Sequence, residues 1–491
     1  MLRHAVILMA LGWAAIANAD RPDTPGTMAT FRFAEDDVVE RADFDRVRVH
    51  FTRSGVNSVP EADIDETGVP DFVELVGTSY DDVLTVYASW GFRLPRSDAD
   101  LEDDNGGDER FDVYLVDFFG SADGSFQTDA CDGGTCIGYA VQENDFVGYG
   151  YPSLERAVGI LSSHELFHAV QAAYDDGQNS VVGEGTAVWA SDRFNPRFRE
   201  VPAFAPGYFE RADRPIDQPL VGAVLDAFGY GASVFFTFLT EHLGDEDLVL
   251  RLWEDCVDGA RGVEDPQWLP ALIAMLERDY DTEFETIFVE FATWNWFTAG
   301  RANPDRAYAE GIRYPEVNMR DATLPFEDVR PRHFRAATRY YRFSAGGRDE
   351  VRARLVGDGA ADLRLRLIDL DTGALSDVRG TEIAAPGAPS MALAIINPSP
   401  AGSSRRATLC LGTEMEVDRC ERLHAEEDDA SLDASFDSSV ADAHTPDARV
   451  SDAGGGDTEP GSPGGGCSAG GSGNAFFGFL VLGILLRKEG P

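Results

Sequence analysis

The chain has 491 residues, of which 43% are hydrophobic, enough for two folded domains with cores of ordinary size. It carries 86 acidic and 41 basic residues, a formal net charge of −45. Such a charge repels phosphate backbones and anionic lipid, so we expect neither nucleic acid nor an anionic membrane as a partner. The balance is typical of a secreted protein that lives in salt or binds Ca²⁺.

The first residues have the order of a secretory signal peptide. Arg3 precedes an apolar run at 5–16, and the small residues at 17–19 come next. This pattern predicts removal of residues 1–19, with cleavage before Asp20. The alternative is a buried first helix.

The cysteines agree with export to an oxidising compartment. Cys131 and Cys136 bracket a tight loop, and Cys410 and Cys420 bracket the end of the predicted folded part. We expect a local disulfide within each pair and a free, buried Cys256.

An acidic loop follows a predicted strand at 47–51. Its spacing matches an EF-hand-type calcium loop, with oxygen ligands at positions 1, 3, 5, 7, 9 and 12 and a glycine at position 6. The expected Ca²⁺ ligands are Asp63, Asp65, Thr67, the carbonyl of Val69, Asp71 and Glu74, with Gly68 at the turn. Pro70 is unusual in such a loop and argues against a complete helix–loop–helix. The alternative is an acidic turn that binds nothing.

Two further strands are predicted before the centre of the chain. A second acidic run at 98–112 fits no calcium register, so we expect a solvated loop there. Residues 110–117 and 137–142 are rich in alternating or β-branched apolar residues, which predicts a strand in each segment.

A metal-binding helix is predicted next. His164, Glu165 and His168 lie in a stretch without Pro or Gly between Ile160 and Asp176, with Gly177 placed as a C-cap. Residues four apart share a helix face, so the two imidazoles can bind one metal ion. Glu165 would then take a proton from the attacking water of a zinc hydrolase. The alternative is a chance match.

A third ligand is needed, because a catalytic zinc site has three protein ligands and an open position. We expect Glu184, near the start of a second predicted helix, the alternative being an exposed carboxylate favoured by the helix dipole. Two histidines from one helix and a glutamate from the next resemble the gluzincin group of zincin metallopeptidases. The chain departs from thermolysin-like members at Val188, where they carry an Asp that orients a ligand His. We expect Asp192 to take that role.

The resemblance covers roughly residues 45–320 and is carried mainly by 164–190. It implies a zincin-like catalytic domain with a small mixed sheet, an active-site helix and an α-rich lower lobe. In zincins a strand at the place of 137–142 forms the sheet edge above the cleft, where a substrate backbone can pair with it. The expected substrate-binding residues are therefore Gly138, Tyr139 and Ala140. The alternative is an ordinary interior strand.

Peptide hydrolysis also needs a donor for the oxyanion besides zinc. Gluzincins often use a downstream Tyr or His. Tyr230 is our first candidate, because flanking glycines would expose its ring, and the alternative for it is a half-buried core aromatic. Tyr174 and His242 are the other candidates.

The rest of the predicted folded chain is helical at first and rich in strands afterwards. Helices are predicted at 232–243, 246–255, 270–278 and 284–297. From about residue 335, strand-like segments separated by Gly and Asp predict a small β-sandwich. The expected fold class is α+β, with a catalytic domain at 20–324 and an all-β accessory domain at 325–422.

The C-terminal part resembles a cell-surface anchor. Residues 423–466 are acidic and rich in Ser, Ala, Gly and Pro, which predicts a disordered linker. A Gly-rich cluster around Cys467, an apolar run at 475–486 and a basic end then resemble a sorting signal of the myxosortase type over 467–491. This implies a sorting peptidase as a partner and a place on the outer cell surface. The alternative is a plain membrane anchor.

Three functions fit these features. The sequence favours a zinc-dependent endopeptidase acting outside the cell on peptides or proteins. The alternatives are a surface adhesion protein with a vestigial metal site and a zinc hydrolase of non-peptide substrates. Glu165 favours an enzyme over an adhesion protein, because a lapsed enzyme often loses its base.

Overall fold

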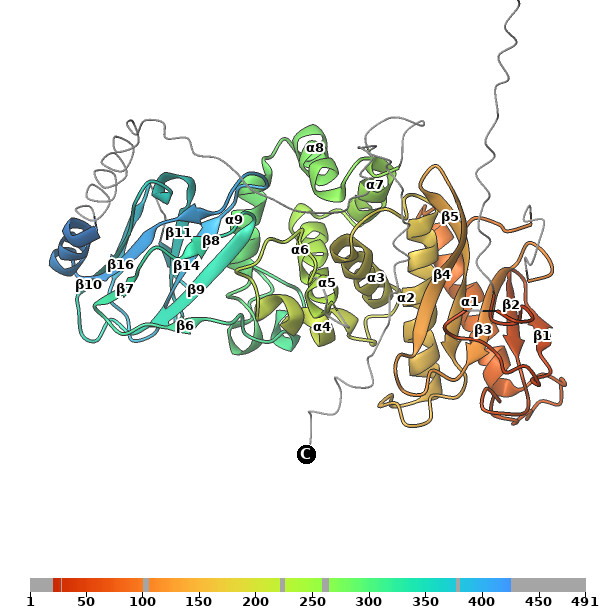
Figure 1. The fold of residues 1–491 in the computed structure, drawn as a ribbon. Coiled ribbons are helices and arrows are strands. Elements are labelled where there is room, and N and C mark those ends of the chain that lie inside the picture. The colour runs from red at the N-terminus through yellow and green to blue at the C-terminus, as the bar shows by residue number, and fades with distance from the viewer. Residues whose placement is uncertain are drawn as a thin grey trace, which may run out of the picture. The chain divides into compact units, whose positions relative to one another are not determined.

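The structure is a computed structural model that describes residues 21–27, 29–99, 106–220, 226–257, 265–376 and 380–424. The fold is α+β, with several mixed sheets (Figure 1). The described residues divide into two compact units, one of residues up to Asn318 with 398–401 and one of the remaining residues from Met319 onward. The predicted signal peptide, the sorting signal and all but two residues of the predicted linker lie outside the described residues. Within the described ranges no helix is both long and apolar enough to span a bilayer.

The first unit is built on one five-stranded sheet with the strand order β1-β2-β3-β5-β4. Strands β2, β3 and β5 are parallel, and β1 and β4 run antiparallel to their neighbours. Helices α1 and α2 pack against each other and against β2, β4 and β5. The bounds are β1 Glu40–Asp43, β2 Val47–Phe51, α1 Asp71–Ser89, β3 Phe111–Val116, β4 Gly124–Asp132, β5 Thr135–Glu143 and α2 Leu154–Ala172.

The predicted edge strand lies inside the sheet. Strand β5, which contains residues 137–142, pairs with β4 from Thr135 to Gln142 and with β3 from Ala140 to Glu143, so it is an interior strand of the sheet. The two edge strands of the described sheet are β1 and β4, and β4 is the neighbour of β5. The close packing of β4 explains why residue 138 is a glycine. A Cβ at this position would lie 2.1 Å from the carbonyl oxygen of Gln127, beside the bulge in β4. The expectation that the strand of Gly138, Tyr139 and Ala140 forms the edge of the sheet was therefore wrong.

The second acidic run is partly buried rather than solvated. The Arg21 guanidinium is fully buried and pairs with Asp98 and Asp129 at 2.6 Å and with Asp112 at 2.5 Å. Asp98 and Asp112 belong to the run at 98–112 that was expected to be a solvated loop. Their partner lies far away in the sequence, so no local pattern announces the contact.

A helical half follows α2 in the first unit. Its aromatic core joins helices through ring contacts such as Phe235 with Phe291 and Phe238 with Trp294. The bounds are α3 Ser180–Phe194, α4 Glu200–Phe209, α5 Ala227–Gly231, α6 Ser233–Leu243, α7 Leu248–Asp255, α8 Trp268–Tyr280, α9 Phe284–Trp294, η1 Ala299–Arg301 and η2 Gly311–Arg313.

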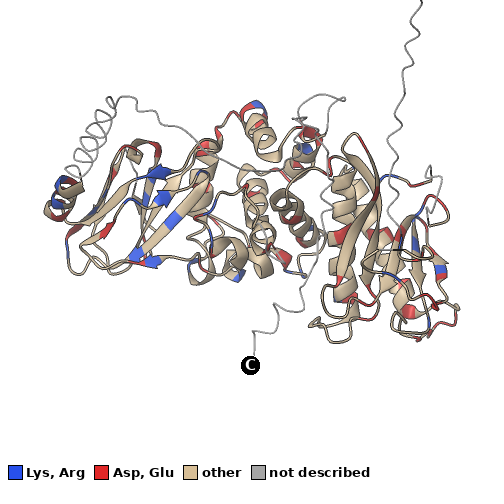
Figure 2. Cartoon of the chain, in the orientation of Figure 1, with Lys and Arg blue, Asp and Glu red and all other residues tan. Residues whose placement is uncertain are grey.

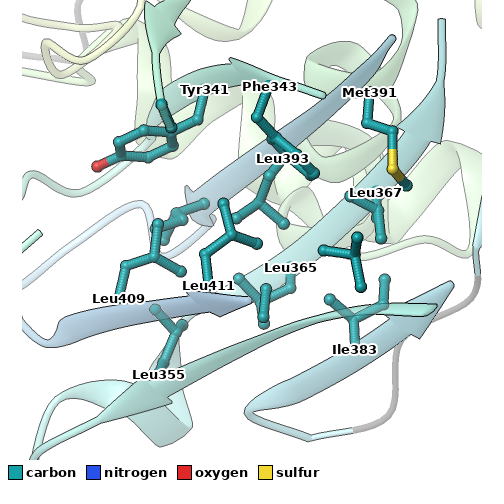
Figure 3. Close-up of a cluster of buried hydrophobic side chains, with 14 of the residues drawn as sticks. Tyr341, Phe343, Leu355, Leu365, Leu367, Ile383, Met391, Leu393, Leu409 and Leu411 are labelled. Atoms are coloured by element: carbon teal, nitrogen blue, oxygen red, sulfur yellow. The ribbon is translucent and has the colours of Figure 1, made fainter. Parts of the chain in front are cut away.

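The second unit contains two main sheets, with strand orders β13-β10-β16-β7 and β12-β11-β14-β9-β6. Alternate side chains of both sheets form one hydrophobic core, which Figure 3 shows around Leu365, Leu393 and Leu411. Residues 414–424 are helical. The bounds are β6 Arg320–Asp321, β7 Phe326–Asp328, β8 Arg332–His333, β9 Ala337–Phe343, β10 Glu350–Val356, η3 Ala360–Asp362, β11 Arg364–Asp369, β12 Leu375–Ser376, β13 Glu382–Pro386, β14 Met391–Asn397, β15 Arg405–Arg406 and β16 Thr408–Gly412.

Both predicted disulfides are confirmed. Cys131 and Cys136 close the β4–β5 hairpin, and Cys410 joins β16 to Cys420 in the helical segment. Cys256 is free and buried, as expected. Cys467 lies outside the described residues.

The second unit should lose stability in acid through His333. Burial, together with the nearby Arg339, lowers the pKa of His333 from 6.5 to about 4. Above pH 6.5 the ring is neutral in both the folded and the unfolded chain, so the unit has its full stability. As the pH falls from 6.5 through 4, the unfolded chain binds a proton more readily than the folded chain, and the free energy of unfolding decreases by up to about 3 kcal/mol. His333→Gln should remove that loss, as measured by hydrogen exchange of residues 319–424 between pH 7 and pH 4. A variant whose protection falls as steeply as that of the wild type would contradict this.

Candidate metal centre

Helix α2 is fixed on both flanks where it carries the histidines. Ser153 caps its first turn by accepting a hydrogen bond from the N–H of Arg156. The Tyr87 hydroxyl of α1 donates to the Ser163 carbonyl at 2.6 Å, and the Ser163 hydroxyl lies 2.7 Å from that of Ser191 on α3. The helix ends at Ala172, so Gly177 is not its C-cap. The segment expected to be helical up to 176 is four residues shorter.

Three donor atoms from α2 and α3 converge at one point. The Nε2 atoms of His164 and His168 are 3.1 Å apart. The Oε2 atom of Glu184 lies 3.2 Å from the first and 3.4 Å from the second. The side chains of His164, His168 and Glu184 are 0%, 13% and 6% exposed, so the point is almost enclosed.

These separations fit a zinc ion. Donors about 2.0–2.1 Å from a tetrahedral ion lie about 3.3–3.4 Å from one another. The three observed separations of 3.1, 3.2 and 3.4 Å lie close to that value. Two imidazoles and one carboxylate are also the donor set of many catalytic zinc sites, and they leave a fourth position open.

The electrostatics of the centre also favour a positive charge. Burial opposes ionisation of both His168 and Glu184. The Glu184 carboxylate nevertheless raises the pKa of His168 to about 9. In turn, the two histidines lower the pKa of Glu184 to about 2. A carboxylate that stays ionised in such an enclosed place attracts a cation.

The group that orients His168 is an amide rather than a carboxylate. The Nδ1 atom of His168 lies 2.8 Å from Oε1 of Gln171, which fixes Nε2 as the free acceptor that a metal ion needs. Gln171 is held in turn by its own amide, which donates to the Gly183 carbonyl and to the Thr186 hydroxyl.

Asp192, expected in this orienting role, lies elsewhere. It accepts a hydrogen bond from the N–H of Glu200 at 2.8 Å and lines a cavity with Trp90 and Trp189. Asp192 shares a face of α3 with Glu184, but eight residues correspond to about 12 Å along a helix axis. The expected role for Asp192 was therefore wrong.

Gln171→Ala should weaken zinc binding because it frees the ring of His168. Loss of such an orienting partner typically costs 10–100-fold in metal affinity, and we expect that range. Competition with a chromophoric chelator would measure it, with Asp192→Asn as the matched control that retains wild-type affinity. Equal affinities for both variants would contradict the role of Gln171.

Glu165 lies against the edge strand of the sheet. Its Oε2 atom accepts the N–H of Phe126 on β4 at 2.8 Å, and its buried Oε1 atom has no partner among the described residues. Burial raises the pKa of Glu165 to about 8. Gly124 leaves room for this approach, because a Cβ there would lie 3.2 Å from Oε1, closer than most Cβ contacts. One carboxylate oxygen is thus fixed and the other is available for a proton.

Of the three oxyanion candidates, Tyr230 is the one beside the histidines. Its ring stacks on His164 at a centroid distance of 5.7 Å, and its hydroxyl interacts with Glu184. The hydroxyl of Tyr174 instead accepts the N–H of Arg93, and His242 stacks on Phe238.

The sequence suggested that the flanking glycines expose the ring of Tyr230. In the structure the side chain of Tyr230 is buried, so that expectation was wrong. The flanking glycines allow close packing instead. A Cβ on Gly231 would lie 2.3 Å from the backbone nitrogen of Tyr208 on α4.

A second acidic group lies in the predicted calcium loop. Carboxylate oxygens of Asp63, Asp65 and Asp71 lie within 4.8 Å of one another. The Thr67 hydroxyl donates to Glu74 at 2.6 Å, and the loop leads directly into α1. The residues between β2 and this loop are not helical, so the loop has an exit helix but no entry helix.

Comparison with known proteins adds no relative to these observations. The chain matches no protein-family model and no curated protein.

Proposed function

We propose that the first unit is a zincin-like catalytic domain and that the protein is a zinc-dependent endopeptidase. The observation that carries this proposal is the convergence of His164, His168 and Glu184 at separations of 3.1–3.4 Å, with Glu165 adjacent and one of its oxygens unpartnered. A zinc ion bound there would supply Lewis-acid polarisation of the substrate carbonyl and of the water.

The chain's own residues would perform the remaining steps. Glu165 takes a proton from the attacking water at Oε1 and later passes it to the leaving amine. Its other oxygen stays on the N–H of Phe126, which holds the carboxylate in place. Tyr230, beside His164 and Glu184, is the proposed donor to the oxyanion.

Strand β4 is the proposed support for the substrate backbone in place of β5. Phe126 directs its N–H away from β5, toward Glu165. Because backbone groups alternate in direction along a strand, Gly124 and Thr128 share this outward orientation and can pair with an extended peptide.

The test of this function is direct. The purified protein should hold one zinc ion per molecule and should cleave internal peptide bonds of an unfolded protein substrate. A chelator should abolish this cleavage. A protein that holds zinc but leaves every protein and peptide substrate intact would overturn the peptidase proposal.

We further propose that the chain acts outside the cell. The two disulfides support an oxidising compartment. The signal-peptide pattern at 1–19 and the resemblance of 467–491 to a sorting signal support export to the cell surface. The second unit is proposed to be a β-sandwich accessory domain, supported by two sheets that share one core.

Ca²⁺ is the proposed ligand of the acidic loop, with an affinity in the range of extracellular calcium modules, about 10⁻⁴ to 10⁻³ M. Calorimetric titration should show binding that disappears in Asp63→Asn/Asp65→Asn. Asp82→Asn, an exposed substitution on α1, is the matched control. Unchanged binding in the double variant would contradict this site.

A further inference from the structure

Exposed apolar side chains of the first unit gather at one end of its sheet. Seven large apolar side chains are exposed among the described residues of this unit, and six of them belong to neighbouring loops or, in one case, to the first residue of α2. We call these six the apolar rim: Val38, Val56, Ile64, Phe119, Val147 and Leu154. All but Leu154 are more than half exposed. The seventh, Ile312, lies in η2.

The topology of the sheet explains why these residues meet. Parallel strands that are neighbours in one sheet end at the same edge, and β2, β3 and β5 are such strands (Figure 1). Val56, Phe119 and Val147 each lie in the loop that follows one of them. Ile64 lies farther along the first loop, and Leu154 begins α2. Val38 precedes β1, whose first residue pairs with the last residue of β2.

Hydrogen bonds hold these loops to one another. Asn57 accepts the N–H of Asp117 at 3.0 Å, and Asn144 donates to the Ser58 carbonyl at 2.8 Å. Glu143 accepts the N–H of Phe118 at 2.9 Å. Asn57 and Asn144 are both buried. The apolar rim is therefore held on a connected platform rather than on independent loops.

Phe119 is held in a costly conformation. Its φ is +54°, a left-handed value that is unfavourable for a bulky residue, and its side chain is 78% exposed. Neither burial of the ring nor backbone preference explains a phenylalanine at this position. A binding role does, because a fixed aromatic ring loses little conformational freedom when it is covered.

The loops that carry the apolar rim are strongly acidic. Within 34–39, 52–70, 117–123 and 144–153, nine acidic residues are at least partly exposed, and the one basic residue, Arg53, is paired with Glu40. Red segments mark acidic residues in these loops in Figure 2. Seven of the acidic residues are Glu35, Asp36, Asp37, Glu61, Glu66, Asp117 and Asp145, and the other two, Asp63 and Asp65, are also proposed Ca²⁺ ligands.

We propose that the apolar rim is a docking surface for a protein partner whose apolar surface is surrounded by Lys and Arg. Apolar side chains inside an acidic border are complementary to that arrangement. The same border repels an anionic bilayer and a second copy of this chain, because like charges would face each other. His164 and Glu184 are not part of this surface, so the proposal is independent of peptidase activity.

Two peptides of equal charge would test it, one of Lys and Leu and one of Lys and Ser. Fluorescence anisotropy with the full chain should show at least tenfold tighter binding of the Lys/Leu peptide. Phe119→Ser/Val147→Ser should lose that preference while it binds the Lys/Ser peptide as the wild type does. Ile312→Ser, which removes an exposed apolar side chain elsewhere, should keep the preference.

Three outcomes would overturn the proposal. The first is an unchanged preference in the double variant, at a melting temperature equal to that of the wild type. The second is that the wild type sediments with phosphatidylglycerol vesicles and the Phe119→Ser/Val147→Ser variant does not, which would assign the surface to lipid. The third is a concentration-dependent dimer that the double variant abolishes, which assigns it to self-association.

Discussion

Glu165→Gln is expected to lower the rate of peptide hydrolysis by between about a hundredfold and ten-thousandfold, the usual contribution of a general base. Glutamine cannot take the proton from water, but its side-chain oxygen can still accept the N–H of Phe126, which Glu165 accepts at 2.8 Å. The fold and the three metal donors should therefore stay intact. Hydrolysis of a quenched fluorescent peptide, measured beside the zinc content, checks both expectations.

Glu155→Gln is the matched control for this variant. Glu155 lies on the same helix as Glu165 but is exposed. Its substitution should therefore leave both hydrolysis and zinc content unchanged. A Glu165→Gln enzyme with full activity would show that another group serves as the base. Loss of zinc together with activity would show that the substitution disturbs the metal centre instead.

Local patterns predicted the elements that carry the candidate site. Alternation placed a strand at 47–51, and β2 has those bounds. The predicted helices at 246–255 and 284–297 correspond to α7 and α9, shifted by a few residues at their ends. Helices α7 and α9 bury one regular face, so their periodicity is visible in the sequence, whereas all five residues of β2 are buried. The approach of Glu184 to the two histidines followed from motif order alone.

The sheet edge could not be predicted in the same way. Strand β4 is partly exposed and carries Gln127, Thr128 and Asp129, so it lacks the apolar run that indicates a buried strand. The more apolar segment at 137–142 was instead given the edge position. Order within a sheet depends on long-range pairing, which one sequence does not reveal.

Contacts through long polar side chains were also missed. Gln171 follows His168 by three residues and lies on the same helix face, which is a usable signal. The resemblance to gluzincins directed attention to a carboxylate on the second helix instead, and Asp192 was chosen because Val188 stands at the usual position. Arg21 gave no signal, because its three carboxylate partners lie 77 to 108 residues away.

Glu184→Gln is expected to weaken zinc binding by at least about a hundredfold, more than loss of an orienting partner. The variant keeps the volume of the side chain but removes the one charged donor of the three. At a free zinc concentration about a thousand times the dissociation constant, zinc stabilises the wild type by about 4 kcal/mol. A hundredfold weaker variant would retain only about 1.4 kcal/mol of that stabilisation.

The pKa of His168 gives a second readout that needs no zinc. The Glu184 carboxylate raises that pKa to about 9, against the effect of burial, so Glu184→Gln should lower it. Chemical shifts of the His168 ring followed by NMR across pH would show the change, and Glu210→Gln, an exposed substitution at the end of α4, should leave it unaltered. If Glu184→Gln kept wild-type zinc affinity while the pKa of His168 fell, Glu184 would be a neighbour of the histidines but not a metal ligand. Zinc loss together with a lowered pKa is the outcome that a shared position of the three donors requires.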